Sequence, residues 1–122
     1  FQHLARTLAR LALSRFDCGF ELSHNRRELW SLPPAAGREA EEARVARLVG
    51  EDFVRHAVHV EHTVAGMTLR GWLGLPAFSR AQPDAQYLFV NGRMVRDRLL
   101  GGAVRLGYRD VLYGGRHPAY VL

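Results

Sequence analysis

Cysteine and lysine are scarce in this sequence. Cys18 is the single cysteine, so the chain can form neither an internal disulfide nor a cysteine-based zinc site. All 17 basic side chains are arginines, and none is a lysine. The lone cysteine agrees with a reducing compartment. Arginine's planar fork of donors suits phosphate, so an all-arginine set is compatible with nucleic-acid binding, although genome composition explains the same feature equally well.

Long hydrophobic runs are also missing. No apolar run approaches the roughly 18 residues that cross a bilayer, and the first residues lack the pattern of a secretory signal. Hydrophobic residues make up 48% of the chain and charged residues 24%, which is typical of folded chains. A length of 122 residues fits one domain. The sequence therefore predicts one compact, soluble, cytoplasmic domain with no membrane partner.

Catalytic signatures are lacking too. The chain has no G-x-S-x-G elbow, no Walker loop and no G-x-G-x-x-G phosphate cradle. His56, His59 and His62 recur every third residue, but on a strand His59 and His62 point to opposite faces and no nearby cysteine completes a ligand set. We expect no catalytic, cofactor or metal residues, with a small hydrolase built on the histidines as a minor alternative.

Hydrophobic periodicity predicts an α+β fold. Spacings of three and four residues indicate helices, and strict alternation indicates strands. The expected helices cover about residues 1–14, a segment ending at Gly50, and 97–112; the expected strands cover 16–22, 27–32, 58–64, 67–75, 86–90 and 119–122. Strands in hairpins with helices on one face make a two-layer sandwich.

Positive charge is concentrated near the C-terminal end. Residues 93–116 hold six arginines and two aspartates, which is +4 of the chain's +5. Asn91-Gly92 predicts a tight turn, and Asp97 is a plausible N-cap for the following helix. If that helix reaches residue 112, Arg98, Arg105 and Arg109 share one face and can neutralise DNA phosphates. The alternative is a solvated face whose arginines pair with acids elsewhere.

One segment resembles a known family. Residues 86–97 read Q-Y-L-F-V-N-G-R-M-V-R-D, which resembles the Q-Y-x-F-V-N-x-R-x-[VM]-x-[DS] segment of the MutL/HexB family of DNA mismatch repair proteins. Further likenesses span essentially the whole chain: Phe16-Asp17 with Leu22-Ser23-His24-Asn25, Leu69-Arg70-Gly71-Trp72-Leu73-Gly74, and His117-Pro118-Ala119-Tyr120-Val121-Leu122.

The resemblance implies a place within a larger protein. Residues 1–122 would form a single transducer-type domain, with a GHKL ATPase domain upstream and a C-terminal dimerisation domain missing. The implied fold is the second-domain fold shared with ribosomal proteins, an α/β sandwich with a left-handed βαβ crossover. Phe1 opens directly into a helical pattern, so we expect an excised piece.

The resemblance also implies a function. The parent would be a slow GHKL-type ATPase that uses ATP and Mg, whereas this fragment would be no enzyme and hold no cofactor. The nucleotide pocket of the parent would lie mainly in the domain that precedes this fragment. The fragment would couple ATP binding to non-specific DNA binding and to recruitment of the mismatch-recognition protein MutS and a downstream repair nuclease or helicase. The parent is expected to be a homodimer, cytoplasmic and associated with the nucleoid during repair.

The residues expected to contact DNA follow from the family and from spacing. The family's R-D-R arginine matches Arg98, and Arg105 and Arg109 are added by helical spacing. Arg93 and Arg96 are further candidates, which could instead hold the turn by pairing with local acids or carbonyls. The alternative function is a free-standing RNA- or DNA-binding α+β module, in which bases stack on exposed Tyr87, Phe89 or Trp72.

Overall fold

The computed structural model describes residues 2–112 and 115–122. Its helices and strands confirm the predicted α+β class. The chain folds into two compact units, one ending at Gly50 and the other starting at Glu51. The single transducer-type domain expected from the sequence stays a prediction. Each unit is described below by itself.

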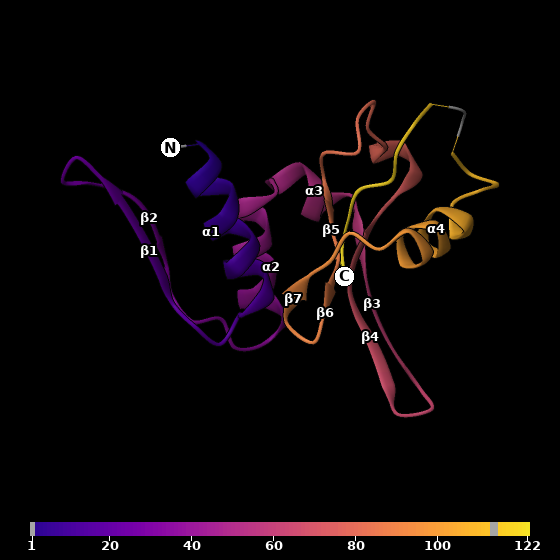
Figure 1. Cartoon of the computed structure of the whole chain (residues 1–122), viewed down its shortest axis with the longest axis horizontal. Helices are drawn as coiled ribbons and strands as arrows, with labels where there is room; N and C mark the ends of the chain where they lie inside the picture. Colours follow the sequence, from indigo (N-terminus) through magenta and orange to yellow (C-terminus); the bar gives the residue numbers. More distant parts are fainter. Residues whose placement is uncertain (1, 113–114) are drawn as a thin grey trace. The chain divides into compact units, whose positions relative to one another are not determined.

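The first unit combines two helices with a hairpin (Figure 1). It contains α1 (Gln2–Ser14), β1 (Phe20–His24), β2 (Arg27–Leu32) and α2 (Arg38–Leu48). The predicted first helix, second strand and second helix are confirmed, while Phe1 lies outside the described residues. Asn25 and Arg26 turn the hairpin with φ of 51° and 63°.

The strand predicted from residue 16 was wrong at its start, because β1 begins at Phe20. Arg44 explains the difference. Its guanidinium donates to the carbonyls of Arg15 (2.9 Å) and Cys18 (2.8 Å), which holds the segment between them in a turn. The Phe16 and Phe20 rings lie 5.7 and 5.6 Å from the same guanidinium. The apolar alternation of this segment therefore surrounds a buried cation instead of forming a longer strand.

The second unit is built on a four-stranded sheet. It begins with α3 (Glu51–Arg55), followed by the hairpin of β3 (Ala57–Val64) and β4 (Met67–Gly74), the short helix η1 (Pro76–Phe78), and β5 (Gln86–Tyr87). The last strand, β8 (Tyr120–Val121), lies between β4 and β5, so the strand order is β3-β4-β8-β5. The β3–β4 hairpin extends beyond the short β5 and β8 in Figure 1.

The core of this unit forms where β8 meets β4. Gly71 has φ of +145°, and a Cβ there would lie 2.0 Å from the Val121 carbonyl, so only glycine allows the two backbones to approach this closely. Phe53, Trp72 and Val121 are nearly inaccessible to solvent beside this contact. The sheet therefore fixes the position of β8 and of the segment that precedes it.

Between β5 and β8 the chain forms a second hairpin and a helix. Strands β6 (Phe89–Val90) and β7 (Arg93–Met94) precede α4 (Arg98–Gly107). Because β5 and β8 pair in parallel, this connection is a βαβ crossover. Its predicted left-handedness stays a prediction.

Candidate nucleic-acid interface

The basic segment starts at the predicted tight turn. Asn91 and Gly92 have φ of 49° and 80° and join the antiparallel strands β6 and β7. Arg93 lies in β7 and Arg96 in the three residues that lead to α4, and both side chains are exposed. Neither side chain forms a hydrogen bond or ion pair with any residue that the structure describes. Pairing of these two arginines with local acids or carbonyls, the alternative considered for them, is therefore not seen among the described residues.

Asp97 begins α4 as expected. Its backbone is extended, and its carboxylate accepts a hydrogen bond from the Leu100 amide at 3.0 Å. This is the N-cap arrangement that satisfies one of the free amides at a helix start. The cap fixes the helix so that Arg98 is its first residue.

Arg98 and Arg105 line one hollow of about 340 Å³, which we call the Arg98 hollow. Gly101 and Gly102 lie between them on α4, and a Cβ at either glycine would meet nothing within 4 Å. The facing wall comes from the segments around β5 and β8: Pro83, Gln86, His117, Pro118 and Tyr120. The helix spacing of seven residues, which predicted one shared face for this pair, thus brings the two arginines to one open hollow.

The Arg98 hollow is basic, and two of its lining side chains, Gln86 and Tyr120, are held by a hydrogen bond or by burial. Arg98 and Arg105 are exposed and form no ion pair with the carboxylates of the described residues. On the wall, the Gln86 side-chain amide donates to the Pro118 carbonyl at 3.1 Å. Tyr120 is buried, and burial raises the pKa of its hydroxyl. An anion entering this hollow would meet two uncompensated guanidinium groups.

The helix expected to reach about residue 112 was too long, because α4 ends at Gly107, and Arg109 lies beyond its end and outside the Arg98 hollow. Tyr108 explains the end of the helix. Its hydroxyl donates to the Gly74 carbonyl at 2.6 Å in a buried position, which draws the chain towards β4. The residues that follow form turns, with the Arg109 amide bonded to the Leu106 carbonyl. Helical spacing therefore does not apply to Arg109.

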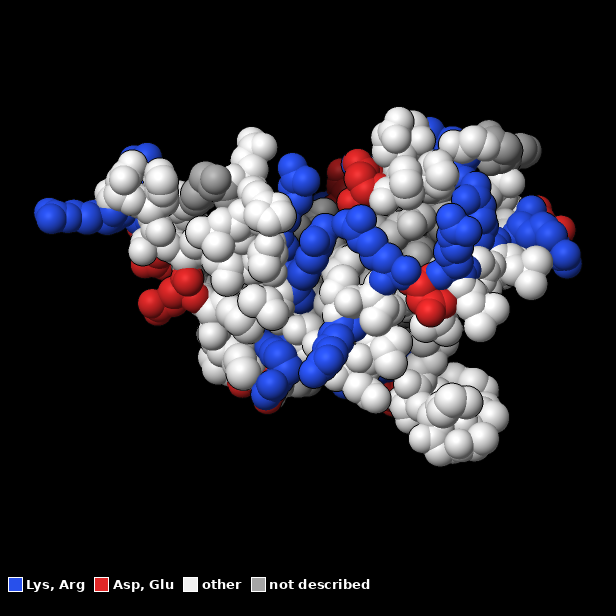
Figure 2. All heavy atoms as spheres, in the orientation of Figure 1, with Lys and Arg blue, Asp and Glu red and all other residues white. Residues whose placement is uncertain are grey.

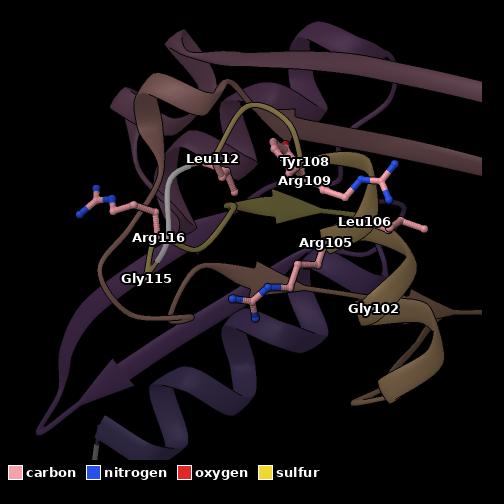
Figure 3. A pocket seen from close by; sticks show the side chains of 8 residues that line it. All are labelled: Gly102, Arg105, Leu106, Tyr108, Arg109, Leu112, Gly115 and Arg116. Atoms are coloured by element: carbon pink, nitrogen blue, oxygen red, sulfur yellow. The ribbon is translucent and has the colours of Figure 1, made fainter.

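Arg109 also differs from the other arginines in its charge environment. It forms an exposed ion pair with Asp110 at 3.8 Å, so its charge is partly compensated. Figure 3 shows its side chain pointing away from that of Arg105. Figure 2 shows blue arginine side chains over the face of the second unit around α4, with red carboxylates among them. The arginines of this unit are therefore separated by carboxylates and do not form one continuous basic surface.

A second hollow of about 380 Å³ adjoins α4, and we call it the Leu106 hollow (Figure 3). Sequence reasoning did not find it. The described residues that line it are Gly102, Arg105, Leu106, Tyr108, Arg109, Leu112, Gly115 and Arg116. Burial raises the pKa of Tyr108 to about 12. Arg116 is held in place, because its guanidinium donates to the Ser79 hydroxyl at 3.0 Å and to the Ser79 carbonyl.

His56, His59 and Trp72 have aromatic partners. The His56 ring stacks on Phe78 at 5.8 Å, and the His59 ring meets Trp72 edge-on at 5.2 Å. Among the residues that the structure describes, no three His, Cys, Asp or Glu side chains are grouped to hold a metal ion. Trp72 is 2% exposed and so offers no surface for base stacking, while Tyr87 and Phe89 are half-buried.

Within residues 2–112 and 115–122, no helix is both long and apolar enough to span a bilayer.

Comparison with known proteins identifies the family. A family model described as "DNA mismatch repair protein, C-terminal domain" matches residues 45–122. The DNA mismatch repair protein MutL is 51% identical in Pseudomonas paraeruginosa, 52% in Azotobacter vinelandii and 49% in Chromohalobacter salexigens, each over 122 residues. These matches cover 100% of this chain but 19% of each relative, so the chain spans about a fifth of their length. The chain belongs to the MutL family of DNA mismatch repair proteins.

Proposed function

We propose that this chain serves DNA mismatch repair as a domain that contacts the phosphate backbone of DNA. The observation that carries the proposal is the Arg98 hollow, where Arg98 and Arg105 are exposed and form no ion pair with a described carboxylate. Family membership supplies the biological context. Within this chain we propose binding and no catalysis.

The chemistry of the hollow favours phosphate over other anions. Guanidinium groups donate paired hydrogen bonds to phosphate oxygens, and seven helical residues separate the two arginines by about 10 Å along the axis. That separation allows contacts to different phosphates of one strand. Arg93 and Arg96 lie before the helix, where they would add positive charge without sharing the hollow. Binding through phosphate alone is independent of base sequence.

Arg109 contributes least to the proposed contact. Its pairing with Asp110 and its position after the helix both reduce its availability to a polyanion. We therefore rank Arg98 and Arg105 first, Arg93 and Arg96 second, and Arg109 last.

The wider role rests on the family. We propose that the parent is a slow GHKL-type ATPase, active as a homodimer, whose ATP and Mg bind in a preceding domain. This chain would be its transducer domain and would couple nucleotide state to the DNA contact. The proposed partners of the parent are MutS and a downstream nuclease or helicase. The support is identity with MutL relatives that are about five times longer than this chain.

A charge reversal tests the DNA contact. Arg98→Glu should weaken binding of the 122-residue chain to a labelled duplex at low salt by about tenfold or more. The change replaces a cation that donates hydrogen bonds to phosphate by a carboxylate that phosphate repels. Fluorescence anisotropy measures the affinity. Arg6→Glu is the matched control, since Arg6 is an exposed helical arginine of the first unit and the charge change is identical. Equal weakening by both variants would reduce the effect to net charge and remove Arg98 from the contact.

A further inference from the structure

We propose that two copies of this chain associate through β3, whose outer edge pairs antiparallel with the same edge of the second copy. β3 is the outer strand of the order β3-β4-β8-β5, so one of its edges has no neighbouring strand among the residues that the structure describes. The strand is eight residues long, and its hairpin extends beyond β5 and β8 (Figure 1). Such an edge offers a row of backbone amides and carbonyls to a further strand. This inference does not depend on the proposed DNA contact.

The outward-pointing backbone groups of β3 belong to every second residue. In an antiparallel pair, residues that exchange hydrogen bonds with the neighbouring strand alternate with residues whose amides and carbonyls point away from it. A two-residue turn is closed by a hydrogen-bonded pair, here Val64 and Met67. At the other end of the hairpin, the Leu75 amide donates to the His56 carbonyl at 2.7 Å. Both ends assign the bonds with β4 to even-numbered residues, so the outward amides and carbonyls are those of Ala57, His59, Glu61 and Thr63.

A two-fold axis at Val60 is the arrangement that uses all four outward residues. Ala57 then lies opposite Thr63 of the second copy, and His59 lies opposite Glu61 of the second copy. An axis at Glu61 would place two carboxylates directly opposite each other, which is destabilising, and would leave Ala57 unpaired. An axis at His59 would leave Thr63 unpaired. The backbone and the charges of β3 therefore favour the same register.

The side chains make this edge complementary to itself. An imidazole N–H of His59 would donate to the exposed carboxylate of Glu61 on the second copy, and the two-fold axis repeats this contact. Trp72 positions the His59 ring, which it meets edge-on at 5.2 Å. Within its own hairpin Glu61 lies opposite Arg70, so the carboxylate would lie between a guanidinium and an imidazole. Two complementary residues placed symmetrically about Val60 favour a second copy over an unrelated strand.

The other face of the hairpin adds an apolar component to the pairing. The even-numbered residues of β3 share this face with the residues opposite them on β4. It carries four exposed apolar side chains, those of Val58, Val64, Met67 and Leu69. Pairing about Val60 would join the two apolar faces into one four-stranded surface. Because a two-stranded hairpin is only marginally stable by itself, the added strands would stabilise it.

Sedimentation velocity of the 122-residue chain tests the association. We expect a reversible equilibrium between monomer and dimer that shifts towards dimer as concentration rises. Glu61→Lys should raise the dimer dissociation constant by about tenfold or more, because it places a cation opposite His59 twice in each dimer. Glu21→Lys is the matched control, since Glu21 is an exposed strand residue of the first unit and the charge change is identical. A chain that stays monomeric at every concentration, or equal effects of both variants, would overturn the proposal.

A proline at position 63 tests the backbone pairing without changing the charge. Thr63→Pro removes an outward amide, which an edge strand tolerates, and should weaken the dimer by about tenfold or more while urea denaturation still shows a folded chain. Thr63→Val keeps the amide and loses only the 2.9 Å hydrogen bond between the Thr63 and Thr68 hydroxyls, so it should dimerise like the wild type. Undiminished dimerisation of folded Thr63→Pro would contradict pairing through this edge.

Oxidation of variants with one added cysteine tests the register. In a Cys18→Ala background, Val60→Cys should form a disulfide between two copies, because opposed residues of a non-hydrogen-bonded pair have Cα atoms about 4.5 Å apart. Val58→Cys is the control, since four residues along the strand, about 13 Å, would separate it from its counterpart. Non-reducing gel electrophoresis measures the cross-link. Cross-linking of Val58→Cys as fast as that of Val60→Cys would overturn the register.

A peptide titration distinguishes a second copy from another strand. An excess of a peptide with the sequence of residues 57–64 should dissociate the dimer, because it offers the same edge. If the chain instead stays monomeric but binds a labelled peptide of alternating Val and Thr, and Thr63→Pro weakens that binding, β3 takes a strand of a different protein. The proposal of self-pairing then fails.

Discussion

At the scale of single residues, the first unit depends on Arg44. The side chain is 3% exposed and donates to four carbonyls, those of Ala12, Arg15, Cys18 and Pro33. Ala12 lies in the last turn of α1 and Arg15 directly after it, where carbonyls lack helical partners. Burial lowers the pKa of Arg44, and the carbonyl dipoles together with the Phe16 and Phe20 rings compensate the charge.

Removing this guanidinium should destabilise the unit. We expect Arg44→Met to lower the free energy of unfolding by about 3 kcal/mol or more, because it leaves buried carbonyls without donors. Arg44→Lys should recover only part of the loss, since one ammonium cannot replace the planar fork. Urea denaturation measures both, with exposed Arg47→Met as control. Similar stability of Arg44→Met and Arg47→Met would refute this role.

In the second unit Tyr108 is the buried side chain that donates to a backbone carbonyl, that of Gly74. Its raised pKa makes the stability of this unit change with pH in the alkaline range. Its pKa is raised to about 12 by burial, above the ordinary value of 10.0. The folded state therefore keeps the hydroxyl proton where the unfolded state loses it. Stability is fully present below pH 10 and falls as pH rises from about 10 to 12, as measured by chemical denaturation across that range.

Tyr108→Phe isolates this contribution. The variant should be less stable at pH 8 by about 1–3 kcal/mol, because the buried Gly74 carbonyl loses its donor. Its stability should also fall less steeply above pH 10, although Tyr120 still titrates with a pKa raised by burial. An alkaline slope identical to that of the wild type would show that Tyr108 is not the group responsible.

At the scale of elements, local signals predicted α4's beginning but not its end. The Asn91-Gly92 turn and the Asp97 cap depend on neighbouring residues alone, and both were predicted correctly. The end at Gly107 depends on the contact between Tyr108 and Gly74, which are distant in sequence. The start of β1 depends likewise on Arg44. The two hollows require the position of β8 between β4 and β5, which periodicity alone does not give.

The glycines of α4 weaken the helix without filling any tight space. Gly101→Ala and Gly102→Ala should each stabilise α4 by up to about 1 kcal/mol, since alanine is the better helix former and the added Cβ meets nothing within 4 Å. Slower hydrogen exchange of the α4 amides would report this. Gly71→Ala is the contrasting case and should destabilise the sheet, because its Cβ would lie 2.0 Å from the Val121 carbonyl. Unchanged exchange in both α4 variants would contradict the expectation.

At the scale of the whole molecule, the family resemblance predicted the protein family, which hydrophobic periodicity did not. The 86–97 segment placed the chain in the MutL family, which the relatives confirm across all 122 residues. Spacing predicted one helix face for Arg98, Arg105 and Arg109; the structure brings Arg98 and Arg105 to one hollow, whereas Arg109 lies beyond the end of α4. The central proposal is that Arg98 and Arg105 contact DNA phosphates, and the number of such contacts can be measured.

The salt dependence of DNA binding counts them most directly. A plot of the logarithm of affinity against the logarithm of salt concentration has a slope that reflects the number of neutralised phosphates. We predict that Arg98→Ala and Arg105→Ala each reduce the magnitude of this slope by about 1 relative to the wild type, while Arg6→Ala leaves it unchanged. Slopes for Arg98→Ala and Arg105→Ala that equal the wild-type slope would contradict the phosphate contact in the Arg98 hollow.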